Sequence, residues 1–297
     1  MPPLPAPPLT LGQCATLACL LEAMAAKPGN VHPGADFADM TFADLATSAV
    51  LVGPCVDAAA GRRVGQTVWE AVRVTRAAVT VNTNLGTLLL FGPLAKVPRA
   101  ETVRDGLPQV LAELDAIDAQ LVYDAIRMAD PGGLGRREMA DVRRPPDRTL
   151  VEAMALAAAD DLVARQYANG FQEVLEQTVP WLVEDLARGR PLDQAIVHVQ
   201  LQLLRDHLDS LMCRKCGVAV ARQASARAAD ALAGGPPGSA AYRQAVTELD
   251  RWLRADGHRR NPGTIADLIA AGLFVALRER MLELPVRWDG EGSRVEG

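Results

Sequence analysis

The chain has 297 residues, of which 49% are hydrophobic and 23% charged, and its formal net charge is −5. These values are ordinary for a soluble globular protein with a sizeable core. The sequence has no long basic stretch, which argues against nucleic acid as a partner, and no apolar run of the roughly 18–20 residues that a membrane-spanning helix requires.

The N-terminal segment MPPLPAPPLT is rich in proline and has neither the basic nor the long apolar region of a secretion signal. The five cysteines are an odd number, and three of them lie in apolar helical runs, so a reducing cytoplasm is the expected location. We expect residues 1–9 to be disordered, residues 10–284 to form one folded domain and residues 285–297 to form a flexible tail.

Helical periodicity runs through almost the whole chain. The first pattern places Leu17, Leu20, Leu21 and Met24 on one face and ends at the breaker KPGN, residues 27–30. Capping-box patterns at 41–44 and 149–152 begin two later helices. Further helical segments cover 64–79, 85–90, 102–113, 118–129, 171–187, 192–212, 216–233, 240–255 and 263–283. The sequence predicts an all-α fold, a single domain of about ten to twelve helices, since it shows no useful strand pattern.

Four polar segments interrupt these helices. The first, residues 26–40, offers Lys27, His32, Asp36 and Asp39 on a loop stiffened by glycine and proline. An ordinary connection between helices is the alternative, but fifteen residues are long for one, which favours a binding loop.

The second polar segment is Asn82-Thr83-Asn84, directly before a leucine-rich run. At a helix start, these side chains and the backbone N–H groups would form an anion or phosphate site at the positive end of the helix dipole. A plain N-cap is the alternative, although it needs only one of the three residues.

The third segment, 205–217, places Arg214 and Lys215 near Asp209 and includes Cys213 and Cys216. The cation pair could bind an anion or could be a solvated helix end. A zinc or redox site at the two cysteines is a weaker hypothesis, because the sequence has no second pair at suitable spacing.

The fourth segment, 256–274, contains the turn Asn261-Pro262-Gly263-Thr264, followed by Asp267 near the start of a helix. This aspartate could complement the helix dipole, or it could hold Mg²⁺ for a nucleotide phosphate.

In order along the chain, KPG at 27–29 with Asp39-Met40, TVNTNLG at 80–86, NGF at 169–171, DSLMCRKCG at 209–217 and PGTIADL at 262–268 resemble the motifs of the triphosphoribosyl-dephospho-CoA synthase family. The resemblance covers about residues 10–280 and implies an all-α enzyme that uses ATP and 3′-dephospho-CoA, releases adenine and requires Mg²⁺. It also implies a role in making a cofactor or prosthetic group. The details look most like a divergent branch that accompanies one-carbon metabolism with tetrahydromethanopterin and methylofuran.

The resemblance implies a set of site residues. Asp39, Asn82 and Asp267 are the candidate catalytic residues, and Asp39 and Asp267 are also the candidate metal ligands. The candidate nucleotide- and substrate-binding residues are Lys27, His32, Thr83, Asn84, Gly86, Asp209, Arg214, Lys215, Asn261 and Gly263.

Two departures from the family pattern bear on the substrate. Asn84-Leu85 stands where the family has His-Lys, and Arg214-Lys215-Cys216-Gly217 stands where it has His-Arg-Gly-Gly. Since a leucine cannot hold a phosphate, a different acceptor in one-carbon cofactor synthesis is one alternative. A non-catalytic helical binding protein that kept the fold is another. The expected partners are small molecules, neither nucleic acid nor a membrane, and a homo-oligomer is possible.

Overall fold

The structure, a computed structural model, describes residues 8–130, 142 and 145–289. These residues form fourteen α-helices, more than the ten to twelve predicted, and the all-α single domain is confirmed. The helices are α1 (Leu11–Met24), α2 (Phe42–Asp57), α3 (Val64–Ala78), α4 (Leu85–Lys96), α5 (Val103–Ala112), α6 (Ala116–Ala129), α7 (Leu150–Ala155), α8 (Leu162–Asn169), α9 (Val179–Ala187), α10 (Leu192–Asp206), α11 (Ser210–Cys216), α12 (Val218–Ala233), α13 (Ala240–Arg254) and α14 (Gly263–Arg278). A 3₁₀ turn, η1 (Ala59–Gly61), and a π-helix, η2 (Glu173–Thr178), complete them.

The two extra helices arise from aspartates that break predicted segments. The predicted helix that begins at 149–152 ends early as α7, and Asp161 then caps α8 by accepting hydrogen bonds from the N–H groups of Val163 and Ala164. The predicted helix over 192–212 divides in the same way, because Asp209 accepts a hydrogen bond from Met212 N–H and starts α11. The predicted capping boxes at 41–44 and 149–152 are confirmed.

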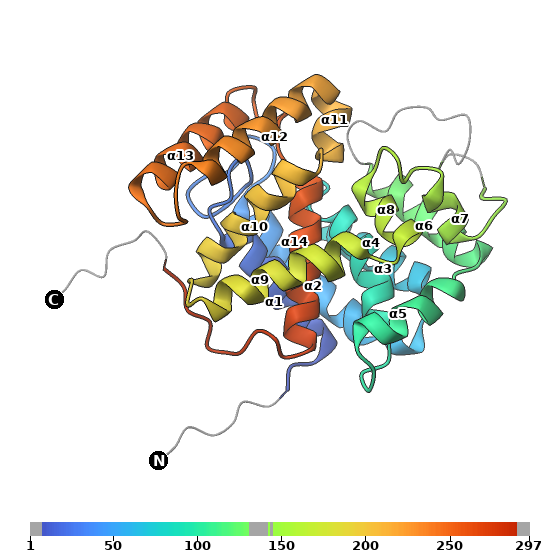
Figure 1. The fold of residues 1–297 in the computed structure, drawn as a ribbon. Helices are drawn as coiled ribbons and strands as arrows, with labels where there is room; N and C mark the ends of the chain where they lie inside the picture. Colours follow the sequence, from blue (N-terminus) through green and yellow to red (C-terminus); the bar gives the residue numbers. More distant parts are fainter. Residues whose placement is uncertain (1–7, 131–141, 143–144, 290–297) are drawn as a thin grey trace, which may run out of the picture.

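Helix α14 forms the centre of the molecule, and thirteen of its sixteen residues are buried. A helix that is apolar on nearly every face must be covered on all sides. In Figure 1, α14 runs between α9, α10, α12 and α13 on one side and α3 to α8 on the other, with α1 against it. The three residues of α14 that are not buried, Gly263, Ala266 and Asp267, lie in its first two turns and line the site.

The ends of the chain are only partly described. Residues 1–7 of the predicted disordered segment and 290–297 of the predicted tail lie outside the described residues. The first part of that tail contacts α10, because Leu192 N–H donates to the carbonyl oxygen of Arg287 at 2.8 Å. Among the described helices, none combines the length and apolar character needed to cross a membrane.

Candidate active site

A cavity of about 620 Å³ opens where α1, α4, α11 and α14 converge with the loops before α2 and α4. Its far wall comes from α6, α7 and α8, with apolar side chains such as Ile126, Met154 and Val163. Ten of the thirteen predicted site residues line it: Asp39, Asn82, Thr83, Asn84, Gly86, Arg214, Lys215, Asn261, Gly263 and Asp267. The polar segments, dispersed in sequence, thus meet in one place.

The start of α4 assigns a different task to each residue of Asn82-Thr83-Asn84. The Asn82 side chain accepts a hydrogen bond from Leu85 N–H at 3.1 Å, and the Thr83 hydroxyl is 2.8 Å from that of Ser48. Asn84 is the N-cap residue but makes no side-chain capping bond. Asn82 therefore stabilises the helix start and Thr83 anchors the loop. Asn84 lines the cavity, and its side-chain oxygen accepts a hydrogen bond from the Thr83 hydroxyl at 3.3 Å.

Asp267 reaches the cavity from α14 and contacts the first turn of α4. Its carboxylate accepts a hydrogen bond from the Thr87 hydroxyl at 2.7 Å. Gly86 packs so closely against the other oxygen that a Cβ at this position would overlap it. Burial raises the pKa of Asp267 to about 7, against the smaller effect of the Thr87 hydrogen bond, so a proton competes for this carboxylate near neutral pH.

Asp209 matches the family motif but lies behind the cavity, where it is fully buried. It accepts hydrogen bonds from Met212 N–H at 2.8 Å and Ile265 N–H at 2.9 Å. It thereby joins the first turn of α11 to that of α14. Burial raises its pKa to about 6, against the opposing effect of those N–H donors.

The loop that follows α1 packs closely against α13. Gly29 has φ +75°, and a Cβ there would lie 2.9 Å from that of Leu253, so the motif requires glycine. Two of the predicted residues on this loop do not line the cavity. The Lys27 side chain is fully buried and pairs with Glu22 at 2.8 Å, and His32 contacts the carbonyl oxygen of Pro33 at 3.0 Å.

Asp39 lies farther along the same loop, at the cavity rim, with 72% of its side chain exposed. It is 3.4 Å from His258, whose ring stacks on Phe37 with 4.2 Å between the centroids. The loop before α2 is thus joined to the loop before α14. Asp39 reaches the cavity from the first of these loops, and Asp267 reaches it from α14 itself.

Within the described part of the chain, three cations face the cavity, and sequence reasoning found two of them. Arg214 is held 2.6 Å from Asp161 across the cavity wall. The Lys215 ammonium has no hydrogen-bond or ion-pair partner within the described residues, and Arg76, at the end of α3, donates to the carbonyl oxygen of Thr80. Arg76, Asp161 and the cavity carboxylate of Glu22 were missed. The sequence does contain a feature that could have identified Glu22, because it is the only charged residue between positions 8 and 26.

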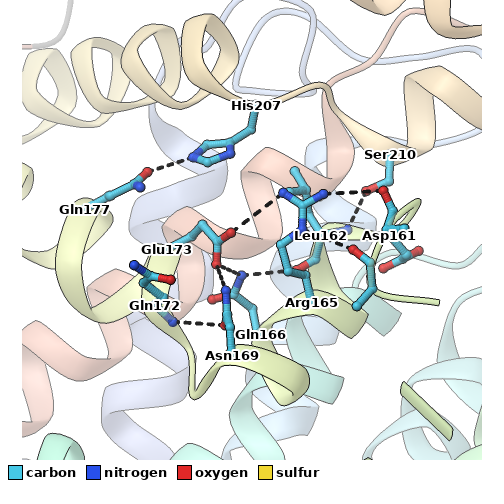
Figure 2. Close-up of polar contacts among 12 residues, drawn as sticks. Asp161, Leu162, Arg165, Gln166, Asn169, Gln172, Glu173, Gln177, His207 and Ser210 are labelled. Atoms are coloured by element: carbon cyan, nitrogen blue, oxygen red, sulfur yellow. Dashed lines mark hydrogen bonds and ion pairs between the residues drawn. The ribbon is translucent and has the colours of Figure 1, made fainter. Parts of the chain in front are cut away.

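A buried polar network supports α8 (Figure 2). Asp161 caps this helix and also pairs with Arg214. At its centre, the Glu173 carboxylate accepts hydrogen bonds from the amides of Gln166 and Asn169, each at 2.7 Å, with Arg165 at 3.7 Å. Glu173 begins the π-helix η2, a geometry often found near functional sites. The NGF motif therefore positions α8 and does not itself enter the cavity.

The described residues contain no group of three or more His, Cys, Asp or Glu side chains placed to hold a metal ion. The zinc hypothesis for Cys213 and Cys216 thus lacks a ligand set in this part of the chain. A Mg²⁺ site needs fewer protein ligands than a zinc site, because one or two carboxylates together with phosphate oxygens and waters commonly hold Mg²⁺. Asp39 and Asp267 each offer such a carboxylate, since both line the cavity.

Comparison with known proteins decides the family. Residues 8–285 match the model of the ATP:dephospho-CoA triphosphoribosyl transferase family. The chain belongs to this family. A crystal structure from Archaeoglobus fulgidus, assigned as a triphosphoribosyl-dephospho-CoA synthase, is 27% identical with a TM-score of 0.62, and the match covers 78% of this chain and 98% of that one. A search of curated protein sequences found no match.

Membership in the triphosphoribosyl transferase family confirms the predicted family function. The protein is an enzyme, a transferase, and the family implies ATP and dephospho-CoA as substrates. The ten predicted residues on the cavity thereby become candidates for a defined task, which is to hold a nucleotide and its acceptor.

Proposed function

We propose that the cavity binds ATP as its Mg²⁺ complex and transfers the triphosphoribosyl group to a hydroxyl of a dephospho-CoA-like acceptor. The observation that carries this proposal is the shared cavity, which gathers the start of α4, the acidic residues Asp39 and Asp267 and three cations. The chemistry fits, because polyphosphate needs cations and N–H donors, and Mg²⁺ needs carboxylates.

In this proposal the triphosphate lies between the start of α4 and the cations Arg76, Arg214 and Lys215. Backbone N–H groups at a helix start favour anions, and the Asn84 amide adds a donor. Asp39 and Asp267 would hold Mg²⁺, which neutralises charge on the phosphates when it is bound. Asn82 keeps the α4 start in the required conformation through its hydrogen bond to Leu85.

The reaction breaks the bond between ribose C1′ and adenine N9, and the electron pair leaves with adenine. The acceptor hydroxyl oxygen forms the new bond to C1′. Such a step requires orientation of the hydroxyl and stabilisation of positive charge at C1′. The apolar wall of α6, α7 and α8 would exclude water, which is the competing nucleophile.

The acceptor is where we propose a departure from the family's usual reaction. Asn84-Leu85 replaces the family's His-Lys at the cavity, and Leu85 is buried. We infer that the chain belongs to the branch linked to one-carbon metabolism and that its acceptor differs from dephospho-CoA in the part that faces α4. All five cysteines are free thiols, which supports a reducing cytoplasm as the location.

The test is to incubate purified protein with ATP, Mg²⁺ and dephospho-CoA and to follow adenine by chromatography. We expect adenine release that depends on Mg²⁺ and on an acceptor. If dephospho-CoA gives none while pterin or furan precursors from one-carbon metabolism do, the acceptor differs and the transfer chemistry stands. If no acceptor gives adenine and Mg²⁺-ATP does not bind, the proposal is wrong.

A further inference from the structure

The buried ion pair between Lys27 and Glu22 lies at the end of α1, beside the cavity. The Lys27 ammonium is 2.8 Å from the Glu22 carboxylate and also donates to the carbonyl oxygens of Glu22 and Ala25. An ammonium has three N–H donors, and these three acceptors use them all. Since its side chain is fully buried and does not line the cavity, Lys27 has no donor left for a phosphate.

Glu22, unlike Lys27, lines the cavity. Its side chain is 15% exposed, and Lys27 is its only ion-pair partner among the described residues. Asp267 is near enough that the Glu22 charge acts on it. The polar end of the cavity thus holds an anion that a buried cation supports from behind.

Lys27 caps the carbonyl oxygens at the end of α1, but this structural role does not account for the carboxylate of Glu22. Removing two charges from water is costly, and an apolar pair of similar size could fill the same space. Moreover, a carboxylate in a cavity for triphosphate repels the phosphates. Because Lys27 already balances the charge of Glu22, Mg²⁺ is assigned to Asp39 and Asp267. Glu22 must then face a part of the substrate that is neutral or becomes positive, and in ATP that part is the ribose, which becomes positive as adenine leaves.

On the basis of the proposed function, we propose that Glu22 is a catalytic carboxylate that faces ribose C1′, and that Lys27 is the positioning residue that keeps it charged and oriented. As the C1′–N9 bond breaks, its electron pair leaves with adenine, and Glu22 stabilises the positive charge on the ribose. The acceptor oxygen then bonds to C1′, and the proton it loses balances the proton that adenine gains. Glu22 itself gains and loses no proton.

The experiment compares Glu22→Gln, Lys27→Met and the double variant with wild type. The measurements are kcat, KM for ATP, and the Kd of Mg²⁺-ATP by calorimetry. Both single variants should lower kcat about 100-fold, the usual effect of losing one electrostatic contact to a transition state, with the Kd of Mg²⁺-ATP changed less than about threefold. The double variant should have the activity of Glu22→Gln and a higher melting temperature than Lys27→Met, because it leaves no unpaired buried charge.

The control is Asp185→Asn, which breaks the buried pair of Asp185 and Arg190 at 3.2 Å, away from the cavity, and should leave kcat unchanged. A tenfold weaker Kd in Lys27→Met, with kcat retained, would mean that Lys27 binds phosphate and would overturn the proposal. Wild-type kcat in Glu22→Gln, or a weaker affinity for Mg²⁺, would also overturn it. If Lys27→Met does not fold, kcat and the Kd of Mg²⁺-ATP for Glu22→Gln and for the double variant still test the proposal.

Failure of the proposal for Glu22 and Lys27 can be distinguished from failure of the proposed transferase function. If wild type releases no adenine with any acceptor, the transferase reaction fails. The Kd of Mg²⁺-ATP for Lys27→Met against wild type still shows whether Lys27 contacts the nucleotide, and a large loss overturns the positioning role.

Discussion

At the scale of single residues, the cavity contains one carboxylate, Asp267, that gains or loses its proton near neutral pH. Asp267 has a pKa of about 7, because burial outweighs its hydrogen bond from Thr87, whereas an exposed aspartate titrates near 4. Below pH 7 a cation must therefore displace a proton in order to bind this carboxylate.

This balance predicts a pH-dependent affinity. We expect the binding constant for Mg²⁺-ATP to fall with decreasing pH below about 7, by up to about tenfold per unit, since the proton and the cation compete for Asp267. Calorimetry between pH 5.5 and 8.5 measures the slope. Asp267→Asn shares the titration of the nucleotide's own phosphate but lacks that of the carboxylate, so its slope should be smaller by about one. Equal slopes in the two proteins would contradict the role of Asp267.

Gly86 provides a second prediction at this scale, because its Cα packs against the Asp267 carboxylate. On propensity alone, Gly86→Ala in the first turn of α4 would stabilise the helix by up to about 1 kcal/mol. We expect instead that the methyl group displaces the carboxylate and weakens Mg²⁺-ATP binding at least about tenfold, or 1.4 kcal/mol. Gly61→Ala, where a Cβ meets nothing within 4 Å, is the matched control. Similar affinities in both variants would refute this reading.

The sequence predicted which segments form the site better than which side chains enter it. Lys27 and Asp209 match family motifs as well as Asp267 does, yet both are fully buried behind the cavity. A polar break in a helical pattern indicates where the chain turns, whether the side chain there enters the cavity or is buried behind it. Whether the side chain faces the cavity or supports it depends on packing against distant helices, which local patterns do not encode.

At the scale of elements, helix boundaries follow the side chains that satisfy helix ends. Thr41 and Thr149 were recognised because an acid three residues later completes each capping box. Asp161 and Asp209 were missed because Ala164 and Met212 stand at that third position. A lone capping aspartate resembles an ordinary polar residue within a helix, and for this reason twelve predicted segments became fourteen helices.

Asp209 carries the main prediction at this scale. In Asp209→Ala the buried N–H groups of Met212 and Ile265 lose their acceptor, and the free energy of unfolding should fall by about 2–4 kcal/mol. Ser239→Ala, at the cap of α13 whose hydroxyl accepts from Tyr242 N–H, is the control and should cost about 1 kcal/mol. Urea denaturation measures both. Equal losses would mean that Asp209 does no more than cap α11.

The pH dependence of this loss has a defined sign. The carboxyl pKa is about 6 in the fold and near 4 in the unfolded chain, so the native state binds the proton more tightly. Wild-type stability from this group therefore falls as pH rises from 4 to 6, by up to about 3 kcal/mol. Since Asp209→Ala lacks the group, the gap between wild type and variant should be larger at pH 5 than at pH 7.5. A gap that widens with pH would contradict the assigned burial.

At the scale of the whole molecule, the site exists only because α14 brings distant segments together. The cavity is lined by residues from Cys19 to Ala270, and the start of α14 is placed by helices on both sides of the core. No spacing along the sequence implies this convergence. It was expected only because the motifs resembled those of a family with one active site.

The convergence predicts that one ligand protects several distant segments at once. With Mg²⁺-ATP at about 100 times its Kd, the free energy of unfolding should rise by about 2.7 kcal/mol, because the ligand binds only the native state. Hydrogen exchange should then slow together in 37–45, 80–88, 211–215 and 261–267, which contain cavity residues. Helix α5 has no residue on the cavity and is the internal control, protected only as far as global stability changes. Protection confined to one of these segments would mean that the nucleotide occupies only part of the cavity and that the four polar segments do not act as one site.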